Sequence, residues 1–325
     1  MRTCPYRIHL WLASFLALLL LVAASGCETR RVKAPSPTPD PVAPESLVDQ
    51  SGEPLSRKSF LDKVREADYI LLGENHASPC HHRVQADIID TLARNGVSVA
   101  IGLEMVPFRN QETLDRFNSG EIGVEDLPNT LDWQDVWGYP FSLYRPVFKA
   151  AEEAGFSLHG LNVDEDLLED FRAGGMQNLG DSQLKGLPCR IIPPPREQKT
   201  ALEREYERHL ELEAVDREND LSRERFFRVQ SLWDSAMAER ARQVREQSGL
   251  PVLVLSGAGH VEYGWGIAHR LSVLDESPEI LSILPWRGQE KPETERGDTF
   301  FYCPRAHPND LGFTLRLNSR GERTS

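Results

Sequence analysis

The sequence predicts an α/β fold: a largely parallel sheet flanked by helices, with a charged helical insertion. Several short segments are continuously apolar, which indicates strands that are buried on both faces of a sheet. Segments with helical spacing of apolar residues separate them, and strands that alternate with helices form βαβ units. The 325 residues are 40% hydrophobic and 27% charged, which is ordinary for a globular domain.

The first 26 residues are predicted to be a lipoprotein signal peptide. Arg2 and Arg7 supply a positive start, and residues 10–23 form an apolar segment shorter than the roughly 20 residues of a membrane-spanning helix. Ala24-Ser25-Gly26 precede Cys27, and small residues directly before a cysteine resemble a bacterial lipobox. We therefore expect an acylated Cys27 that anchors the chain to a membrane. A plain secretory signal is the alternative.

Residues 27–46 are predicted to be a proline-rich tether that is extended and lets the domain stand off the membrane. The residue directly after Cys27 is Glu28 and not the aspartate that would favour retention in the inner membrane. We therefore expect the chain at the outer membrane of the bacterial cell envelope, with its domain facing the periplasm. Three further cysteines follow, and their positions alone assign no pairing: Cys80, Cys189 and Cys303.

The charge of the chain argues against nucleic acid as a partner. The formal net charge is −13, and no run of lysine and arginine is present. Binding a phosphate backbone requires a basic face, so we expect no nucleic-acid partner.

The folded domain is predicted over 47–290, followed by a C-terminal extension over 291–325. Its first helix is expected at 59–66 with Ser59 as N-cap, and Pro79 is expected to open the second. The other expected elements are strands at 69–72, 98–105, 157–163 and 251–255, weaker strands at 281–284 and 299–302, and helices at 109–118, 142–154 and 218–248.

The charged insertion is predicted at about 196–228. It mixes Glu and Arg densely, and Leu202, Tyr206 and Leu210 recur at near-helical spacing. Three prolines at 193–195 mark its boundary. A solvated helix with charge pairs is favoured over a helix that binds a ligand.

Polar side chains stand where the predicted strands end. Glu74 and His76 follow the first strand, Glu104 ends the second, Asn162 the third, and His260 follows the fourth. The carboxyl ends of parallel strands share one edge, where ligand crevices form. Two histidines and two carboxylates could hold a divalent metal or act as an acid/base cluster. A structural hydrogen bond is the alternative for each residue alone.

Two more histidines, His81 and His82, lie near the start of the second helix. Neighbouring helical side chains point in different directions, so at most one of them is expected to face the crevice with His76. A helix N-terminus disfavours protonated imidazole, which favours a neutral form that can act as a ligand. A hydrogen bond back to the preceding loop is the alternative.

Aromatic residues gather at 133–144, where they could wall a pocket for a flat apolar ligand or pack in the core. Tyr263 follows His260 closely and is a candidate axial ligand for ferric haem, since a phenolate oxygen can hold the iron. Tyr139, Tyr144 and Tyr206 are its rivals. The chain has no Cys-x-x-Cys-His, so covalent haem attachment is not expected.

Taken in order over about 55–275, several motifs resemble the ChaN family of iron-regulated, haem-binding bacterial lipoproteins. The motifs are Gly-Glu-Asn-His at 73–76, His-His-Arg-Val-Gln at 81–85, Gly-Leu-Glu-Met at 102–105, Trp-Gly-Tyr-Pro-Phe-Ser-Leu-Tyr-Arg-Pro at 137–146, Leu-Asn-Val at 161–163, Gln-Ser-Leu-Trp-Asp-Ser-Ala-Met-Ala at 230–238, Gly-Ala-Gly-His at 257–260 and Gly-Trp-Gly-Ile at 264–267. Residues 77–80 differ from the family pattern, and Trp265 stands where tyrosine is common.

The resemblance implies an α/β fold, non-covalent haem binding between two protomers, and a role in haem or iron uptake. It implies a tyrosine on the iron and a partner-subunit histidine near the propionates, for which Tyr263, His81 and His82 are the candidates. A homodimer and a haem-transport receptor are the partners that it suggests.

The paired Gly-x-x-His motifs, at 73–76 and 257–260, also resemble those of the Tiki/TraB metalloproteases and the erythromycin esterases. This resemblance implies an alternative function as a metal-dependent peptidase or esterase. His76 and His260 would bind the metal, and Glu74 or Glu104 would be the general base for metal-bound water. A third hypothesis is an envelope scaffold with a vestigial site.

Overall fold

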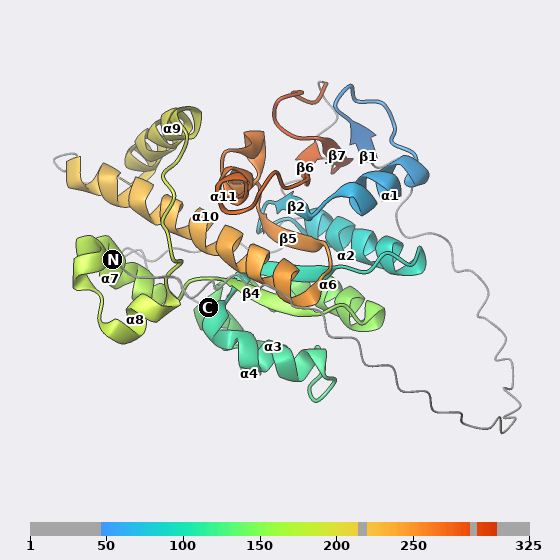
Figure 1. Cartoon of the computed structure of the whole chain (residues 1–325), viewed down its shortest axis with the longest axis horizontal. Coiled ribbons are helices and arrows are strands. Elements are labelled where there is room, and N and C mark those ends of the chain that lie inside the picture. The colour runs from blue at the N-terminus through green and yellow to red at the C-terminus, as the bar shows by residue number, and fades with distance from the viewer. Residues whose placement is uncertain (1–46, 214–219, 287–290, 304–325) are drawn as a thin grey trace, which may run out of the picture. The chain divides into compact units, whose positions relative to one another are not determined.

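A seven-stranded sheet forms the centre of the protein in a computed structural model that describes residues 47–213, 220–286 and 291–303 (Figure 1). The strand order is β1-β7-β6-β2-β5-β3-β4. Adjacent strands are parallel except β1 and β7, so the predicted α/β fold with a largely parallel sheet is confirmed. The strands are β1 (Leu47–Asp49), β2 (Tyr69–Glu74), β3 (Ala100–Pro107), β4 (Leu158–Asn162), β5 (Val252–Gly257), β6 (Ile280–Trp286) and β7 (Thr299–Tyr302).

Helices connect the strands and cover both faces of the sheet. The α-helices are α1 (Arg57–Glu66), α2 (Pro79–Arg94), α3 (Gln111–Asn118), α4 (Leu127–Thr130), α5 (Trp133–Val136), α6 (Phe141–Ala154), α7 (Glu165–Gly174), α8 (Asp181–Gly186), α9 (Arg196–Glu213), α10 (Asp220–Ser248) and α11 (Ile267–Leu274). Short 3₁₀ turns are η2 (Phe108–Asn110), η3 (Gly175–Asn178), η4 (Ala258–His260) and η5 (Glu262–Gly264).

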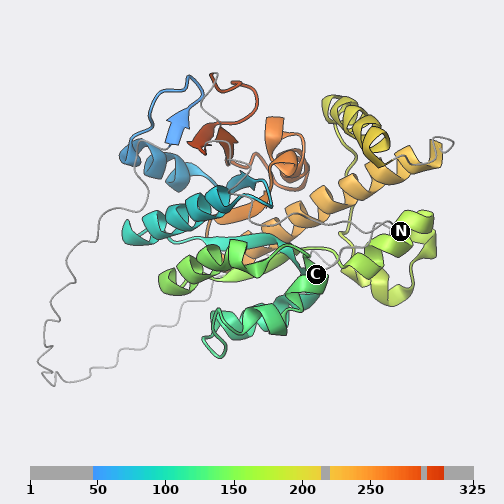
Figure 2. The same ribbon diagram turned by 180° about the vertical axis from the view of Figure 1, so that it is seen from behind.

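The two faces of the sheet carry separate cores, because successive residues of a strand point to opposite sides. Leu72 of β2 packs in the core that α2 and α6 cover, the face seen in Figure 2. Leu71 packs in the core that α10 and α11 cover, the face toward the viewer in Figure 1. Both residues are fully buried, which agrees with the continuous apolar pattern of this strand.

The start of α1 corrects one prediction. Ser56, not Ser59, is the N-cap, and its side chain accepts a hydrogen bond from the backbone N–H of Ser59. Both serines suit a cap, and the helix takes the earlier one. Pro79 opens α2 as predicted, with Ser78 as its N-cap.

The sheet extends beyond residue 290, where the sequence placed the end of the domain. β7 pairs with β6 and β1, so the weaker strand signal at 299–302 marks a true strand of the sheet. β1 was missed, because its three residues are too few to establish a period. The signal peptide, the tether and residues 304–325 lie outside the described residues.

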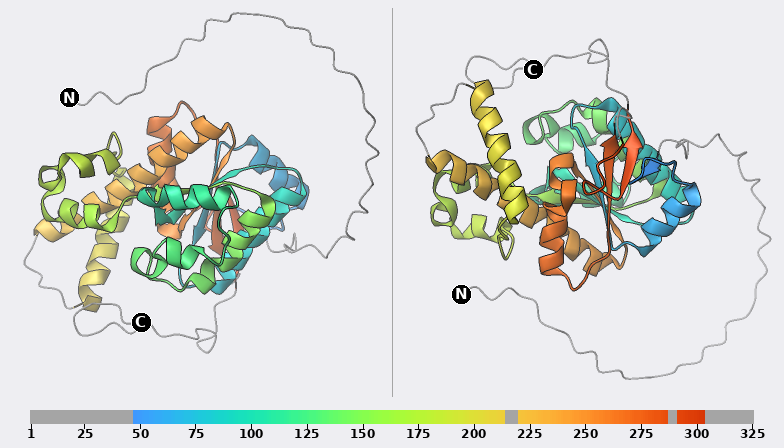
Figure 3. Two further views of the ribbon diagram at one scale, coloured as in Figure 1. Left: turned by 90° about the horizontal axis from the view of Figure 1, so that it is seen from below. Right: turned by 90° about the horizontal axis from the view of Figure 1, so that it is seen from above.

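The charged insertion consists of α9 and the first part of α10. Figure 3 shows α9 to the side of the sheet, next to the N-terminal half of α10. That half of α10 packs with α7 and α8 around a small core that includes Leu168, Phe171 and Leu232. Within the part of the chain that the structure describes, no helix is long and apolar enough to cross a membrane.

Candidate functional site

The register of the sheet brings the predicted strand-end residues to one edge. β5 lies between β2 and β3, with Glu74 opposite Gly257 and Leu103 opposite Leu255. Glu74 ends β2, Glu104 lies in β3 just after the part that pairs with β5, and His260 follows β5 between them. Glu74 lies on the α2 and α6 side, whereas Glu104 contacts His260, which in turn contacts Asp234 of α10.

Glu74 is a buried carboxylate that receives four hydrogen bonds. Tyr144 Oη donates to Oε1 at 2.6 Å, and Gln85 Nε2 donates to Oε2 at 2.7 Å. The Nδ1 atoms of His76 and His82 lie 2.9 Å and 3.1 Å from its two oxygens. Burial raises the pKa of Glu74, but the two histidines outweigh burial and hold this pKa well below its usual range. Glu74 is therefore an anion that fixes the orientation of His76.

His82 is placed differently from the sequence-based expectation. It is fully buried, and its Nε2 lies 3.1 Å from the backbone oxygen of His76. Burial lowers the pKa of His82, but Glu74 outweighs burial, so this pKa is raised. The nearby carboxylate thus acts on the pKa of His82 in the direction opposite to the helix N-terminus, which disfavours protonated imidazole. His82 therefore acts as a buried hydrogen-bond partner of Glu74.

A second histidine–carboxylate group forms on the other face of the sheet. His260 Nδ1 lies 2.6 Å from Asp234 Oδ1, and His260 Nε2 lies 3.4 Å from Glu104 Oε1. Glu104 also accepts a hydrogen bond from the Gly257 backbone N–H at 2.5 Å. Asp234, which is 1% exposed, was missed as a site residue, although it lies in the 230–238 motif that the sequence analysis used.

The two groups meet over Gly257, at the end of β5. A Cβ atom at this position would lie 3.0 Å from His76 Nε2 and 3.6 Å from Glu104 Oε2. A glycine therefore leaves room for the His76 ring over the strand end, where a Cβ atom would make a tight contact. Each imidazole thus has its Nδ1 beside a carboxylate, and the His76 ring and Glu104 both lie next to Gly257. This geometry suits proton transfer to or from a bound group.

The second group makes stability depend on pH. Burial lowers the pKa of His260, but Glu104 and Asp234 outweigh burial and raise it to about 10 from 6.5. A raised pKa in the folded state contributes stability that is complete below pH 6.5 and is lost as pH rises through about 10. We expect the melting temperature to fall between these pH values, and His260→Gln to flatten this fall. Thermal unfolding of both proteins across this range checks the prediction, and parallel slopes would contradict it.

A metal ion is not favoured by the positions of the donors. Among the side chains that the structure describes, no group of three or more His, Cys, Asp and Glu is arranged to hold a metal. Both ring nitrogens of His260 face carboxylates, so a metal at Nε2 would have to replace its contact with Glu104. Metal binding by His76 and His260 stays a prediction.

The aromatic segment is partly core. Trp133 and Tyr144 are buried in the core. Trp137 and Tyr139 are half-buried, and their rings lie 4.9 Å and 5.4 Å from the ring of His76, measured between centroids. These two residues pack beside His76, and their role in a ligand pocket stays a prediction.

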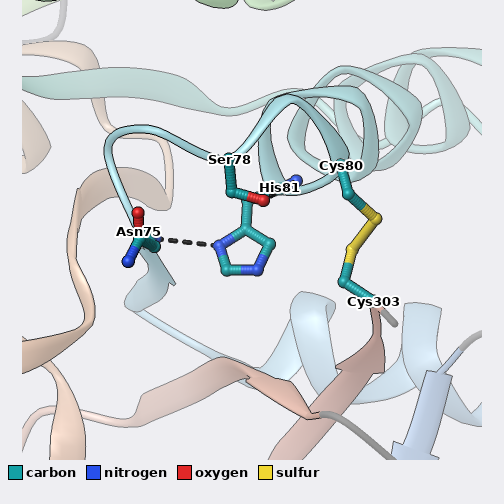
Figure 4. The surroundings of a disulfide bond; sticks show 5 residues. All are labelled: Asn75, Ser78, Cys80, His81 and Cys303. Atoms are coloured by element: carbon teal, nitrogen blue, oxygen red, sulfur yellow. Dashed lines mark hydrogen bonds between the residues drawn. A yellow bond between two sulfur atoms is a disulfide. The ribbon is translucent and has the colours of Figure 1, made fainter. Parts of the chain in front are cut away.

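His81 lies apart from the crevice and orders the loop before α2 (Figure 4). Its Nδ1 accepts a hydrogen bond from the backbone N–H of Asn75 at 2.8 Å, the structural alternative that the sequence analysis kept open. Cys80 beside it forms a disulfide with Cys303, which directly follows β7. The disulfide ties the last described strand to the helix that carries His82 and Gln85.

Tyr263 and Asn162 also lie outside the hydrogen-bonded groups around Glu74 and Glu104. Tyr263 has a φ of 58°, stacks on Trp265 with ring centroids 4.3 Å apart, and donates its hydroxyl hydrogen bond to Glu293 at 2.8 Å. Asn162 ends the edge strand β4, and its Oδ1 accepts from the Val163 backbone N–H. Tyr263 instead forms a half-exposed aromatic pair with Trp265.

Among solved structures, the chain is similar to ChaN of Campylobacter jejuni, reported with cofacial haem binding, at 20% identity and a TM-score of 0.63. The similarity covers 79% of this chain and 95% of that one. The type III effector HopBA1 (12% identity, TM-score 0.46, 81% and 99% covered) and an erythromycin esterase in its open conformation (16%, 0.41, 74% and 78%) are more distant, and no argument is drawn from them. No curated protein matches the chain.

The family described as "Haem-binding uptake, Tiki superfamily, ChaN" matches residues 60–271. This range includes the helix that carries His82, the ends of β2, β3 and β5, and the Tyr263–Trp265 pair. The chain is a member of the ChaN family of haem-binding uptake proteins in the Tiki superfamily.

Proposed function

We propose that this chain binds haem non-covalently and acts in bacterial haem or iron uptake. The observation that carries the proposal is the family match over residues 60–271, which contains β2, β3, β4 and β5 of the sheet. Haem is the cargo of such a protein, so the binding site must be reachable from outside and must release its ligand. The tyrosine on the iron should therefore be an accessible one.

The positions of the tyrosines favour Tyr263 over Tyr144 as the iron ligand. Tyr144 is fully buried and its hydroxyl donates a hydrogen bond to Glu74, so its oxygen is not accessible to a haem iron. Tyr263 is half-exposed beside Trp265, and this pair supplies a flat aromatic surface next to a phenol. Burial and Glu293 raise the pKa of Tyr263. Binding ferric iron would release the phenol proton and replace the hydrogen bond to Glu293, so haem affinity should increase with pH.

Tyr263→Phe tests this assignment. The change keeps the ring on Trp265 and removes the iron ligand, so we expect ferric haem affinity to fall about tenfold or more. Haemin titrations followed by absorbance measure it. Tyr302→Phe, at the exposed last residue of β7, is the matched control, and Tyr139→Phe and Tyr206→Phe test the rivals. An unchanged spectrum and affinity in Tyr263→Phe would reject Tyr263 as the ligand.

The proposed setting is the bacterial cell envelope, with acylated Cys27 anchoring the chain to the outer membrane and the domain facing the periplasm. The lipobox-like sequence before Cys27 and the proline-rich segment after it support this setting. A homodimer that encloses haem, with His81 near the propionates, and a haem-transport receptor as partner belong to the same proposal.

Hydrolysis of a peptide or ester is the second candidate function. The observation that favours it is that His76 and Glu104 both lie next to Gly257 and that His260 contacts Glu104, with the Nδ1 of each histidine held by a carboxylate. In the metal-dependent form, the two histidines would hold the ion, which would supply a nucleophilic water. Glu104 lies against the His260 imidazole and would take the proton of that water, whereas Glu74 already accepts hydrogen bonds from four donors.

His260→Ala tests the hydrolase hypothesis. We expect it to abolish both metal uptake and turnover of peptide or ester substrates, whereas His159→Ala on edge strand β4 should leave both unchanged. Metal content and turnover, with and without added Zn²⁺, are the measurements. Metal content that is equal in wild type and His260→Ala would exclude the metal-dependent form, and a haem Soret shift without any turnover would leave haem binding as the function.

A further inference from the structure

The charged insertion is linked to the His260 group through one buried residue, Gln198. Gln198 lies in the first part of α9 and is 5% exposed, whereas its neighbours Glu197 and Lys199 are exposed. Among the side chains of α9 that the structure describes, Gln198 is the buried one. Burying an amide is unfavourable unless both its donor and its acceptor are paired, so its partners indicate why it is there.

The amide of Gln198 bridges two buried charges. Its Nε2 donates to Asp234 Oδ2 at 3.0 Å, and its Oε1 accepts from Arg270 Nη1 at 2.5 Å. Asp234 and Arg270 are 1% and 0% exposed, and Arg270 Nη1 also lies 3.4 Å from Asp234 Oδ2. A glutamine suits this place because it offers a donor to the anion and an acceptor to the cation.

The same carboxylate holds His260. Asp234 uses Oδ2 for Gln198 and Oδ1 for His260 Nδ1, at 2.6 Å, and His260 Nε2 reaches Glu104. The path therefore runs from α9 to α10, to the turn after β5 and to Glu104 in β3. The charged groups that face His260 are Glu104 and Asp234, with Arg270 behind Asp234 and His76 across Gly257.

Without Gln198, Arg270 would draw Asp234 away from His260. Nε and Nη2 of Arg270 have no acceptor among the described residues, so its hydrogen bonds depend on Nη1. Nη1 donates to Gln198 and to the backbone oxygens of Trp265 and Gly266. If the glutamine oxygen is removed, Asp234 Oδ2 is the nearest charged acceptor that can take its place beside Arg270 Nη1. A stronger contact between Asp234 and Arg270 would weaken the hydrogen bond between Asp234 and His260.

We propose that Gln198 is a positioning residue through which the charged insertion holds Asp234 and His260 in place, so that the crevice is complete only while α9 is docked on the α/β unit. The insertion is then part of the site instead of a solvated helix. This inference concerns the same crevice as the proposed functions and rests on them only in assigning His260 to the site.

Gln198→Met tests the proposal in the full chain, because methionine keeps the length of the side chain and loses both polar groups. The readout is the imidazole Nδ1–H signal of His260 in protein labelled with ¹⁵N-histidine, assigned by its loss in His260→Gln. We expect this signal to move upfield and its exchange with water to become about tenfold faster, since the bond to the carboxylate weakens. Lys199→Met, one residue along α9 and exposed, is the matched control and should leave the signal unchanged.

A His260 signal that is identical in wild type and Gln198→Met would overturn the proposal. If Gln198→Met does not fold, Gln198→Glu provides a second test. It retains an acceptor for Arg270 but loses the donor to Asp234, so the signal should again shift. The readout needs neither haem nor substrate, so the absence of haem binding or turnover would contradict the proposed functions and leave this inference intact.

Discussion

Glu74→Ala should destabilise the protein by about 3–5 kcal/mol, because it removes one partner of a buried, charged hydrogen-bond network. Four donors lose their acceptor at once, and three of them, on His82, Gln85 and Tyr144, are fully buried. Chemical denaturation measures the change in free energy of unfolding. The melting temperature should fall by about 6–20 °C.

Two variants serve as controls for Glu74→Ala. Glu74→Gln can still accept from Tyr144 without the negative charge, so it should cost less than Glu74→Ala. Glu66→Ala removes an exposed carboxylate at the end of α1 and should change stability by less than about 0.5 kcal/mol. Equal stabilities for Glu74→Ala and Glu66→Ala would contradict the role given to the network.

Loss of the Cys80–Cys303 disulfide should cost about 2–4 kcal/mol, which corresponds to about 4–16 °C in melting temperature. The bond closes a loop with a sequence separation of 223 residues, and long loops gain most from a cross-link in the chain-entropy account. It also ties β7 to α2 (Figure 4). The double variant Cys80→Ser, Cys303→Ser should therefore unfold at lower temperature than wild type.

Reduction provides the control for the disulfide. With excess reductant, wild type should melt close to the double variant, because both then lack the bond. A double variant that matches oxidised wild type would show that the bond adds no stability, and a gap that persists under reduction would assign the loss to the serine side chains.

The sequence was sufficient for the sheet and for the residues at its strand ends, for physical reasons. Buried parallel strands need continuous apolar segments, and these stand out at 69–72 and 251–255. Parallel pairing then forces Glu74, Glu104 and His260 to one edge, so their proximity follows from topology. β1 has three residues and is held by pairing with β7, a distant partner that periodicity cannot reveal.

The hydrogen-bond partners of these residues could not be predicted from the sequence. Asp234 lies in the middle of the long helix α10, where its sequence position does not indicate a partner. Only the packing of α10 on the sheet brings its carboxylate to His260. Gln198 lies in a stretch dense with Glu and Arg, which predicted solvent exposure. The raised pKa of His82 follows from its short distance to Glu74, which the helix-terminus argument does not contain.

The most direct test of the central proposal is a haemin titration of the full chain in detergent, followed by absorbance around the Soret band. We predict a saturable, shifted band with a charge-transfer feature typical of tyrosinate, and loss of that feature in Tyr263→Phe. A featureless response that does not saturate would contradict haem binding and would direct attention to the His76 and His260 crevice as a hydrolase site.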